Sequence, residues 1–496
     1  MMLNLVLPLL YLFSPMVLGS PIGDLFSVID NSDSPSDSPP DSPTDSPPTS
    51  PTSSKLVVAH YMVGNTNRYR VDDWETHIQR ADNTGFDAFA LNIGNDAWQI
   101  GQLKRAFEAA GRHENFNLFI SLDMNSIPCN TQDDAGFMDA ISQFFDDPQY
   151  QLYDGKPLLS TFSGQDCTFG HASVVDGWKY ALSRSRRMIH FVPSFFAQDG
   201  GFPHDLAAMD GGFNWNSAWP VGRSNISFHS DSNWINDLGG RTYMAGVSPW
   251  MFAHYSSATL NKNMIYYMDE WMLTKRWEQL IEHRQQVDIV QAITWNDFGE
   301  SHYIGPLLSS ESQPGSEEWT TGYDHTPWLD LFAFYINAFK TGTYTISQDR
   351  IFLWARLFPA MAETPDPVGP PHNREMTQDA VWAVFLLTKR GDIQLECGDQ
   401  QQIWRNVPRG ISKVQIPLQS DCQVKAFVGR AGESLDSSSL RIPLPLPPAS
   451  HRLDIPAYHH SVPPTSNKNG EIPLRTRRER LLMERVQSRA GQNCKA

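Results

Sequence analysis

Short apolar runs alternate with amphipathic segments from residue 55 to about residue 345 of the chain. Eight runs have strand length, and in chain order they are Leu56–Met62, Phe86–Ile93, Asn117–Met124, Pro157–Ser163, Met188–Phe196, Met209–Trp219, Tyr243–Phe252 and Asp288–Asp297. Helical spacing follows several of them, at Asp73–Asn83, Gln99–His113, Thr274–Gln286 and Trp328–Lys340. Eight strands with crossovers over roughly 290 residues suit a TIM-type barrel, which usually takes about 250. We therefore predict an α/β fold with a (β/α)8 barrel at residues 55–342.

A doubly wound open sheet is the competing interpretation of the same alternation. Such a sheet usually has a glycine-rich phosphate-binding turn after its first strand. The first run here leads into "HYMVGNTNRY", which lacks that glycine pattern. The barrel is therefore the preferred prediction.

The pattern changes after about residue 343 to shorter runs with strict alternation. These runs are "VWAVFLLT", "DIQLEC", "KVQIPL" and "CQVKAFVG", separated by Gly, Pro and Asp. Short alternating strands with such turns are typical of antiparallel sheets. We predict a smaller β-sandwich domain at residues 343–447.

The two ends of the chain carry neither pattern. Met1–Leu18 is apolar, short and interrupted by two prolines, which predicts a secretory signal peptide at residues 1–19. Residues 20–54 repeat Ser, Asp and Pro and predict a disordered, O-glycosylated spacer. Residues 448–496 include "RTRRERLLMERVQSR" and predict a disordered basic tail, with a basic helix on an anionic wall polymer as the alternative.

Composition narrows the class of protein. A net charge of −16 argues against nucleic-acid binding, which needs a basic surface. Fifteen Trp residues are many, and Trp often grips the flat faces of sugar rings, although we expect about half of them in the core. The signal peptide and the lack of another bilayer-length apolar stretch predict a secreted protein, extracellular or in a cell wall, without a transmembrane anchor.

Five cysteines agree with an oxidising compartment. Cys129 with Cys167, and Cys397 with Cys422, are candidate local pairs that leave one cysteine in the tail, although sequence alone leaves the connectivity open. Asn225 begins an Asn-Ile-Ser triplet and is a candidate glycosylation site.

Nearly every predicted strand ends on a polar or aromatic residue. In a barrel of this kind these ends converge on one mouth, where the chemistry takes place. A single Asn or Ser at such a position is more often a turn former, so the convergence carries the prediction. The strand-end residues are His60, Tyr61, Asn92, Asp123, Ser163, Gln165, Asp166, Ser194, Asn214, Trp215, Asn216, Trp250, Trp295, Asn296, Asp297 and Glu300.

The chemistry that these residues suit is cleavage of a glycosidic bond. The chain has no HExxH, no paired CxxC and no GxSxG, so we expect neither metal, cofactor nor serine nucleophile. In "AITWNDFGES", Asp297 ends the eighth run and Glu300 follows three residues later. Two carboxyl groups in one cleft can act as acid and base. The second acidic pair, Asp269 and Glu270, is either catalytic or a helix cap, with equal weight.

Eight blocks of sequence together resemble one known family. They are "VVAHYMVGNT", "GFDAFALNIG", "FISLDM", "DGKPLLSTFSG", "GGFNWNSAWP", "VSPWMFAHY", "YYMDEW" and "ITWNDFGESHYIGP". Together they resemble family 71 of the glycoside hydrolases, the fungal endo-α-1,3-glucanases or mutanases. The resemblance implies an inverting hydrolase of α-1,3-glucan with an acidic pair that corresponds to Asp297 and Glu300.

The candidate substrate-binding residues combine the strand ends with these blocks. They are His60, Tyr61, Asn92, Asp123, Asn214, Trp215, Asn216, Trp250, Asp269, Glu270, Trp271, Trp295, Asn296, His302 and Tyr303. Trp295, which lies inside a strand pattern, is equally well interpreted as core. We expect a monomer whose partner is the polysaccharide.

Two questions remain open at this level. The alternatives to α-1,3-glucan hydrolysis are a glycosidase of another linkage and a catalytically silent glucan-binding wall protein. The division of labour between the carboxylates is also undetermined. A loop carboxylate among aromatics is more easily desolvated, which favours Glu300 as acid and Asp297 as base.

Overall fold

The computed structural model describes residues 55–196, 206–220, 225–266, 271–311, 313, 315–356, 358–363, 365–418, 422–430, 436–441 and 457–462. The predicted signal peptide, the spacer, Asp269, Glu270 and most of the basic tail lie outside these residues. Among the described residues no helix is both long and apolar enough to cross a bilayer.

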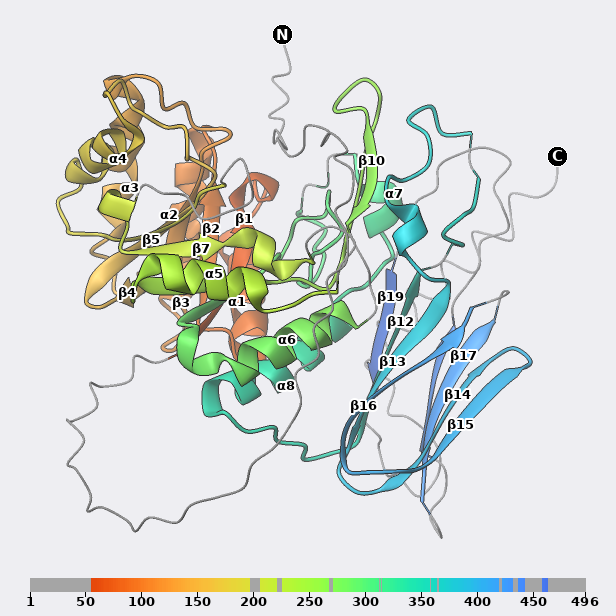
Figure 1. Ribbon diagram of the computed structural model, residues 1–496. Coiled ribbons are helices and arrows are strands. Elements are labelled where there is room, and N and C mark those ends of the chain that lie inside the picture. The colour runs from red at the N-terminus through yellow and green to blue at the C-terminus, as the bar shows by residue number, and fades with distance from the viewer. Residues whose placement is uncertain are drawn as a thin grey trace, which may run out of the picture.

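All eight predicted runs form parallel strands of one curled sheet (Figure 1). The strands are β1 (Leu56–Met62), β2 (Ala88–Ile93), β3 (Asn117–Asp123), β5 (Lys156–Phe162), β6 (His190–Ser194), β7 (Gly211–Asn214), β8 (Thr242–Val247) and β11 (Ile289–Ala292). Except for β6 and β7, successive parallel strands are neighbours in the sheet, and the first strand pairs with the eighth, Val57 opposite Val290. An open doubly wound sheet does not pair its first and last strands in this way.

The ends of this strand order are β6 and β7, which follow each other in the chain. The backbone N–H of Asp210, just before β7, donates to the carbonyl of Phe191 in β6 at 2.9 Å. A carboxylate oxygen of Asp210 accepts from the N–H of Phe191 at 2.9 Å. Backbone and side chain thus hold the two ends of the curled sheet together.

Helices cover the outside of the sheet. They are α1 (Val71–Thr84), α2 (Trp98–Ala110), α3 (Phe137–Ile141), α4 (Val174–Ser183), α5 (His229–Leu238), α6 (Met272–Glu282) and α8 (Pro327–Thr341). The short α7 (Glu317–Thr320) lies elsewhere, with Trp319 packed against Phe252 and Ile265. In α8, Pro327 occupies the first turn and Gly342, at φ 77°, ends the helix. Proline at the start and a left-handed glycine just past the end are the expected signals.

Two short antiparallel features accompany the parallel strands. Residues Leu152–Tyr153 form β4, which pairs with the start of β5. The hairpin of β9 (Met251–Tyr255) and β10 (Lys262–Tyr266) follows β8 and stands apart from the parallel sheet. The seventh predicted run, which ended at residue 252, therefore contains the end of β8 and the start of β9, separated by Pro249.

Two four-stranded antiparallel sheets follow α8, and we call them the C-terminal sheets. One has the order β16 (Gly410–Pro417), β13 (Ala380–Leu387), β12 (Arg350–Arg356), β19 (Ala457–Val462). The other has the order β15 (Gln400–Val407), β14 (Gly391–Cys397), β17 (Gln423–Gly429), β18 (Asp436–Arg441). Residues of β14 alternate between buried and partly exposed, as a sheet with one covered face requires. The strand β19 lies in the segment that we expected to be a disordered tail.

One of the C-terminal sheets, through β12 and β13, shares a hydrophobic core with the helices of the curled sheet. Figure 1 shows this sheet beside α6 and α8. Trp328 of α8 contacts Trp354 of β12 with ring centroids 5.0 Å apart. Trp382 of β13 meets Trp271 edge-on at 4.8 Å. At the rim of this junction, Lys413 of β16 donates to Glu278 of α6 at 2.5 Å. The side chains in this junction are large rings, so the two parts are packed against each other and not merely tethered.

Candidate active site

The segment after β11 turns back on itself and carries both predicted catalytic carboxylates. The N–H of Asp297 donates to Thr294 Oγ1 at 2.9 Å, and the N–H of Glu300 donates to Asp297 Oδ1 at 3.2 Å. The backbone of Trp295 donates to the carbonyl of His60 at 2.7 Å, which fixes the segment to the end of β1. Local bonds of this kind place the two carboxylates in one turn without help from a helix.

Asp297, Glu300 and His302 converge on one point. One carboxylate oxygen from each acid and one ring nitrogen of His302 lie within 4.8 Å of one another. His302 Nε2 is 2.9 Å from Glu300 Oε2, and its Nδ1 is 3.1 Å from Thr294 Oγ1. The Thr294 hydroxyl has one proton and accepts from Asp297, so we assign its proton to His302 Nδ1. With this assignment the Nε2–H donates to Glu300.

Burial and charge act differently on the two carboxylates. Burial, together with the negative charge of Glu300, raises the pKa of Asp297 to about 6, while His302 opposes the shift. Glu300 accepts the hydrogen bond from His302 and keeps its side chain 15% exposed. The environment therefore favours a protonated Asp297 at mildly acidic pH.

The same three residues have the donor types that could hold a metal ion. Two carboxylates and an imidazole suit several divalent cations, but acidic clusters of this size are also common without one. Asp297, Glu300 and His302 form the one such group among the described residues.

Tyr255 and Lys262 of the β9–β10 hairpin complete the surroundings of the acidic pair. Burial raises the pKa of Tyr255, and the charges of Glu300 and Asp297 add to the shift. Burial lowers the pKa of Lys262, while the charge of Glu300 opposes it. Gly299 lies between these groups, because a Cβ at this residue would be 3.5 Å from both Asp297 Oδ1 and the Tyr255 hydroxyl.

Sequence reasoning missed both hairpin residues. The apolar run that contains β8 continues into β9, so the change of direction at Pro249 carried little signal. The alternation of Met251, Ala253 and Tyr255 would have been the available clue.

His60, near the end of β1, and Trp215, which directly follows β7, pack against each other. Their rings meet edge-on with centroids 5.0 Å apart, and Trp215 also packs against Phe162 at 4.8 Å. Burial lowers the pKa of His60 to about 3, with a smaller contribution from His302, so His60 is neutral. Trp215 is partly exposed, so it remains a candidate platform for a sugar ring.

Further strand ends present polar atoms without partners. Asn92 of β2 and Ser194 of β6 are buried, and Asn92 Nδ2 and Ser194 Oγ have no hydrogen-bond partner among the described residues. At the end of β3, burial raises the pKa of Asp123 to about 6, although hydrogen bonds from backbone N–H groups of the following turn act to lower it.

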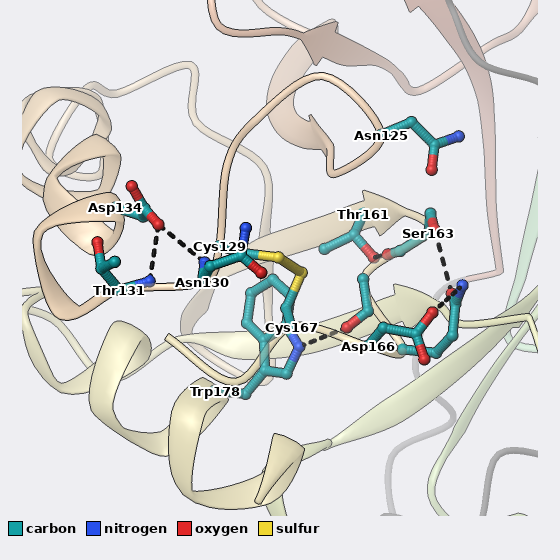
Figure 2. Close-up of a disulfide and its surroundings, with 12 residues drawn as sticks. Asn125, Cys129, Asn130, Thr131, Asp134, Thr161, Ser163, Asp166, Cys167 and Trp178 are labelled. Atoms are coloured by element: carbon teal, nitrogen blue, oxygen red, sulfur yellow. Dashed lines mark hydrogen bonds between the residues drawn. A yellow bond between two sulfur atoms is a disulfide. The ribbon is translucent and has the colours of Figure 1, made fainter. Parts of the chain in front are cut away.

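The loops after β3 and β5 are joined by the disulfide Cys129–Cys167 (Figure 2). Figure 2 shows the indole of Trp178 beside this disulfide, and its N–H donates to the carbonyl of Gly164 at 2.9 Å. Gly164 has φ 110°, and a Cβ there would come within 2.8 Å of the Trp178 ring, so only glycine fits. The second predicted pair, Cys397–Cys422, is also a disulfide, between the end of β14 and the residue before β17.

Comparison with known proteins identifies the family of this site. Residues 53–443 match the family model of glycosyl hydrolase family 71. The chain belongs to that family. This confirms the predicted family and the prediction of a glycoside hydrolase.

Three curated relatives of this family-71 hydrolase span most of its length. Glucan endo-1,3-alpha-glucosidase agn1 of Schizosaccharomyces pombe is 36% identical over 399 residues, which cover 78% of this chain and 90% of that protein. Mutanase Pc12g07500 of Penicillium rubens is 32% identical, covering 77% of this chain and 83% of that protein. The ascus wall endo-1,3-alpha-glucanase of Schizosaccharomyces pombe is 30% identical, covering 73% and 86%.

Three residues that we predicted to contact substrate are fully buried in this family-71 hydrolase and bond to other protein groups. Trp295 is fully buried and donates its indole N–H to His77 Nδ1 at 2.9 Å. Tyr61 is also fully buried, with its hydroxyl 3.1 Å from that of Tyr69. Asn296 Oδ1 accepts from the backbone of Met62 at 2.7 Å and so clips the catalytic turn to β1.

Three further predicted substrate residues, Trp250, Trp271 and Tyr303, contact protein groups around the catalytic turn and the junction with the C-terminal sheets. The indole of Trp250 donates to the carbonyl of Ser301 at 3.2 Å, and that of Trp271 donates to the carbonyl of Ala383 at 3.3 Å. Tyr303 is buried and stacks on a histidine ring with centroids 3.9 Å apart. These rings hold the backbone of the catalytic turn and the junction.

The remaining predicted residues of the family-71 chain differ in their exposure to solvent. Asn214 is buried at the end of β7 and donates to Ser230 at 3.0 Å, whereas the next-but-one residue, Asn216, is exposed. Asn225, the candidate glycosylation site, is exposed. Asp269 and Glu270 lie outside the described residues.

A buried acid that sequence reasoning missed lies behind the catalytic turn. Burial raises the pKa of Glu311 to about 8, although Tyr69 donates to it at 2.5 Å and the N–H of Leu308 at 2.6 Å. Tyr69 also bonds His77, which accepts from Trp295. This network ties the loop around Glu311 to the indole two residues before Asp297.

Proposed function

We propose that this family-71 hydrolase cleaves internal bonds of α-1,3-glucan in fungal cell walls, with Asp297 and Glu300 as its acidic pair. The observation that carries the proposal is the convergence of these two carboxylates with His302 at the end of β11. The names of the relatives support the substrate, since all three include α-1,3-glucanase or mutanase activity. The partly exposed Trp215, which directly follows β7, suits a sugar face.

In this mechanism Asp297 is the general acid and Glu300 the general base. The raised pKa of Asp297 lets it keep a proton for the leaving glycosidic oxygen. Glu300 accepts from His302 and interacts electrostatically with Lys262, surroundings that suit a base that activates water. The sequence favoured the reverse assignment, because it could not show that burial and the charge of Glu300 together raise the pKa of Asp297.

The hydrolysis inverts the anomeric centre in our proposal. Inverting pairs usually stand roughly 6.5–9.5 Å apart, so that a water fits between base and sugar. The nearest ligand atoms of Asp297 and Glu300 are closer, within 4.8 Å. Glu300 is partly exposed, and within the described part of the chain its side chain is hydrogen-bonded to His302 only. It is therefore the carboxylate that can rotate away and admit the water.

The first test is analysis of the products from α-1,3-glucan. We expect oligosaccharides of mixed length, as an endo-acting enzyme makes, and proton NMR of the first-formed products should show the β-anomer before mutarotation. Parallel incubations with α-1,4-glucan and β-1,3-glucan are the controls and should release no more than background. An initial α-signal would contradict inversion, and release from α-1,4-glucan alone would contradict the substrate.

The pH profile tests the assigned roles. A general acid works protonated, so kcat/KM should fall about tenfold per pH unit as the pH rises above about 6, the pKa of Asp297. The measurement is kcat/KM on α-1,3-glucan across the mildly acidic to mildly alkaline range. If Asp297 were the base instead, the limb near pH 6 would have the opposite sign, with activity lost on acidification.

The architecture and location complete the proposal. We take residues 55–342 as a closed (β/α)8 barrel and residues 343–447 as an accessory β-sandwich, because β6 meets β7 and the C-terminal sheets enclose a second hydrophobic cluster. The chain is secreted as a monomer to the cell wall or medium and glycosylated at Asn225. The exposed position of Asn225 and two disulfides support this location.

A further inference from the structure

The β9–β10 hairpin has two faces with different neighbours. Side chains of a strand alternate between faces, and Tyr255 pairs with Lys262 while His254 pairs with Asn263. The first pair therefore shares one face with Met251, Ala253 and Met264, and the second pair shares the other.

The face with Tyr255 and Lys262 is turned to the catalytic pair. Both residues interact electrostatically with Glu300, and Tyr255 also with Asp297. The base of the hairpin holds the same segment by its backbone, because the N–H of Phe252 donates to the carbonyl of Glu300 at 3.1 Å. A displacement of the hairpin would therefore move its side chains and the Glu300 backbone together.

The opposite face is held by the loop between β12 and β13 of the C-terminal sheets. His254 Nε2 lies 2.7 Å from Asp366 Oδ2, and both side chains are almost fully buried, at 5% and 1% exposure. Next to this contact, Asn263 Nδ2 donates to the carbonyl of Gly369 at 2.9 Å.

The backbone of the same loop extends the hairpin as a third strand would. The N–H of His372 donates to the carbonyl of Asn263 at 2.8 Å, and the N–H of Ile265 donates to the carbonyl of His372 at 2.9 Å. The side chain of Asn373 adds a bond to the carbonyl of Ile265 at 3.1 Å. The hairpin thus has a hydrogen-bonded edge that originates outside the curled sheet.

We propose that the β12–β13 loop is a positioning element of the active site, which acts through the buried His254–Asp366 contact to hold Tyr255 and Lys262 against the carboxylates. The proposal rests on the assignment of Asp297 and Glu300 as the catalytic pair. It makes the C-terminal sheets part of the catalytic apparatus and not a separate module.

The test is a double-mutant cycle between Asp366→Asn and Lys262→Met. Asp366→Asn keeps the shape but weakens the contact to His254, and we expect kcat on α-1,3-glucan to fall about tenfold or more, with a smaller change in KM. In the Lys262→Met background, Asp366→Asn should lower kcat by a much smaller factor, because the ammonium group that Asp366 helps to position is no longer present. Hydrogen exchange of the amides of residues 251–266 should increase in Asp366→Asn.

Controls separate positioning from general stability. Asp392→Asn removes a solvent-exposed ion pair with Arg405 in the C-terminal sheets and should leave kcat unchanged. Asn373→Gly, at φ 67°, removes one bond to the hairpin without backbone strain and should lower kcat by a few-fold even if Asp366→Asn folds poorly. Full additivity in the cycle, or wild-type kcat in both loop variants, would overturn the proposal. A wild-type chain inactive on α-1,3-glucan would instead overturn the proposed function.

Discussion

Asn in place of Asp297 is expected to abolish hydrolysis of α-1,3-glucan while the fold stays intact. Loss of a general acid or base costs about 10²–10⁴-fold in rate, and the neighbouring Glu300 cannot take both roles at once. Glu300→Gln is expected to be equally inactive. Turnover of α-1,3-glucan, measured by reducing ends over hours, is the assay.

Thermal unfolding separates this loss from misfolding. Burial raises the pKa of Asp297 above its ordinary value of 3.8, so its charge destabilises the fold as the pH rises toward and beyond about 6. The neutral Asp297→Asn variant should therefore unfold at the same or a higher temperature than the wild type at neutral pH. Azide should restore activity to the Glu300→Gln variant only, since it replaces a water-activating base. Near wild-type activity in both variants, with an inactive Asp269→Asn, would move the catalytic assignment to the second acidic pair.

The tryptophans Trp295 and Trp215 are expected to respond in opposite ways to truncation. Trp295 is fully buried and bonded to His77, so Trp295→Ala should lower the free energy of unfolding by about 3–5 kcal/mol. Trp215 is partly exposed against His60, and Trp215→Ala should raise KM or shift product lengths with little change in Tm. Each variant serves as the matched control for the other.

Chemical denaturation and product chromatography measure the two effects. A Trp295→Ala variant as stable as the wild type would show that the cavity collapses without cost, against the tight packing of Phe86 and Phe89 around this ring. A Trp215→Ala variant with unchanged KM and products would remove this ring from the substrate path.

The strands of the curled sheet were predictable because parallel strands are buried on both faces. All six residues of β2 are buried, and such strands produce continuous apolar runs that stand out against the amphipathic helices. Asp297 and Glu300 were predictable for a related reason, since an acidic residue at the end of such a run is conspicuous.

Residues that act through tertiary contacts were not predictable from the pattern. The burial of Glu311 depends on a loop that folds back on Tyr69, far away in the chain. The partition of tryptophans between core and surface also depends on packing, because Trp295 and Trp215 both end apolar runs. The His254–Asp366 contact joins a hairpin strand to a loop of the C-terminal sheets, so no local spacing marks it.

The junction between the helices and the C-terminal sheets bears on how the two parts of this chain are inherited. It contains the rings of Trp328, Trp354 and Trp382. They belong to one hydrophobic core that crosses from the helices into the C-terminal sheets, and the family match from residue 53 to 443 crosses the same junction. If recombination replaced only the C-terminal sheets, the new sheet surface would not be shaped to pack against the ring of Trp328. The two halves of the chain therefore form one heritable block, and lineages of this family should exchange them together or not at all.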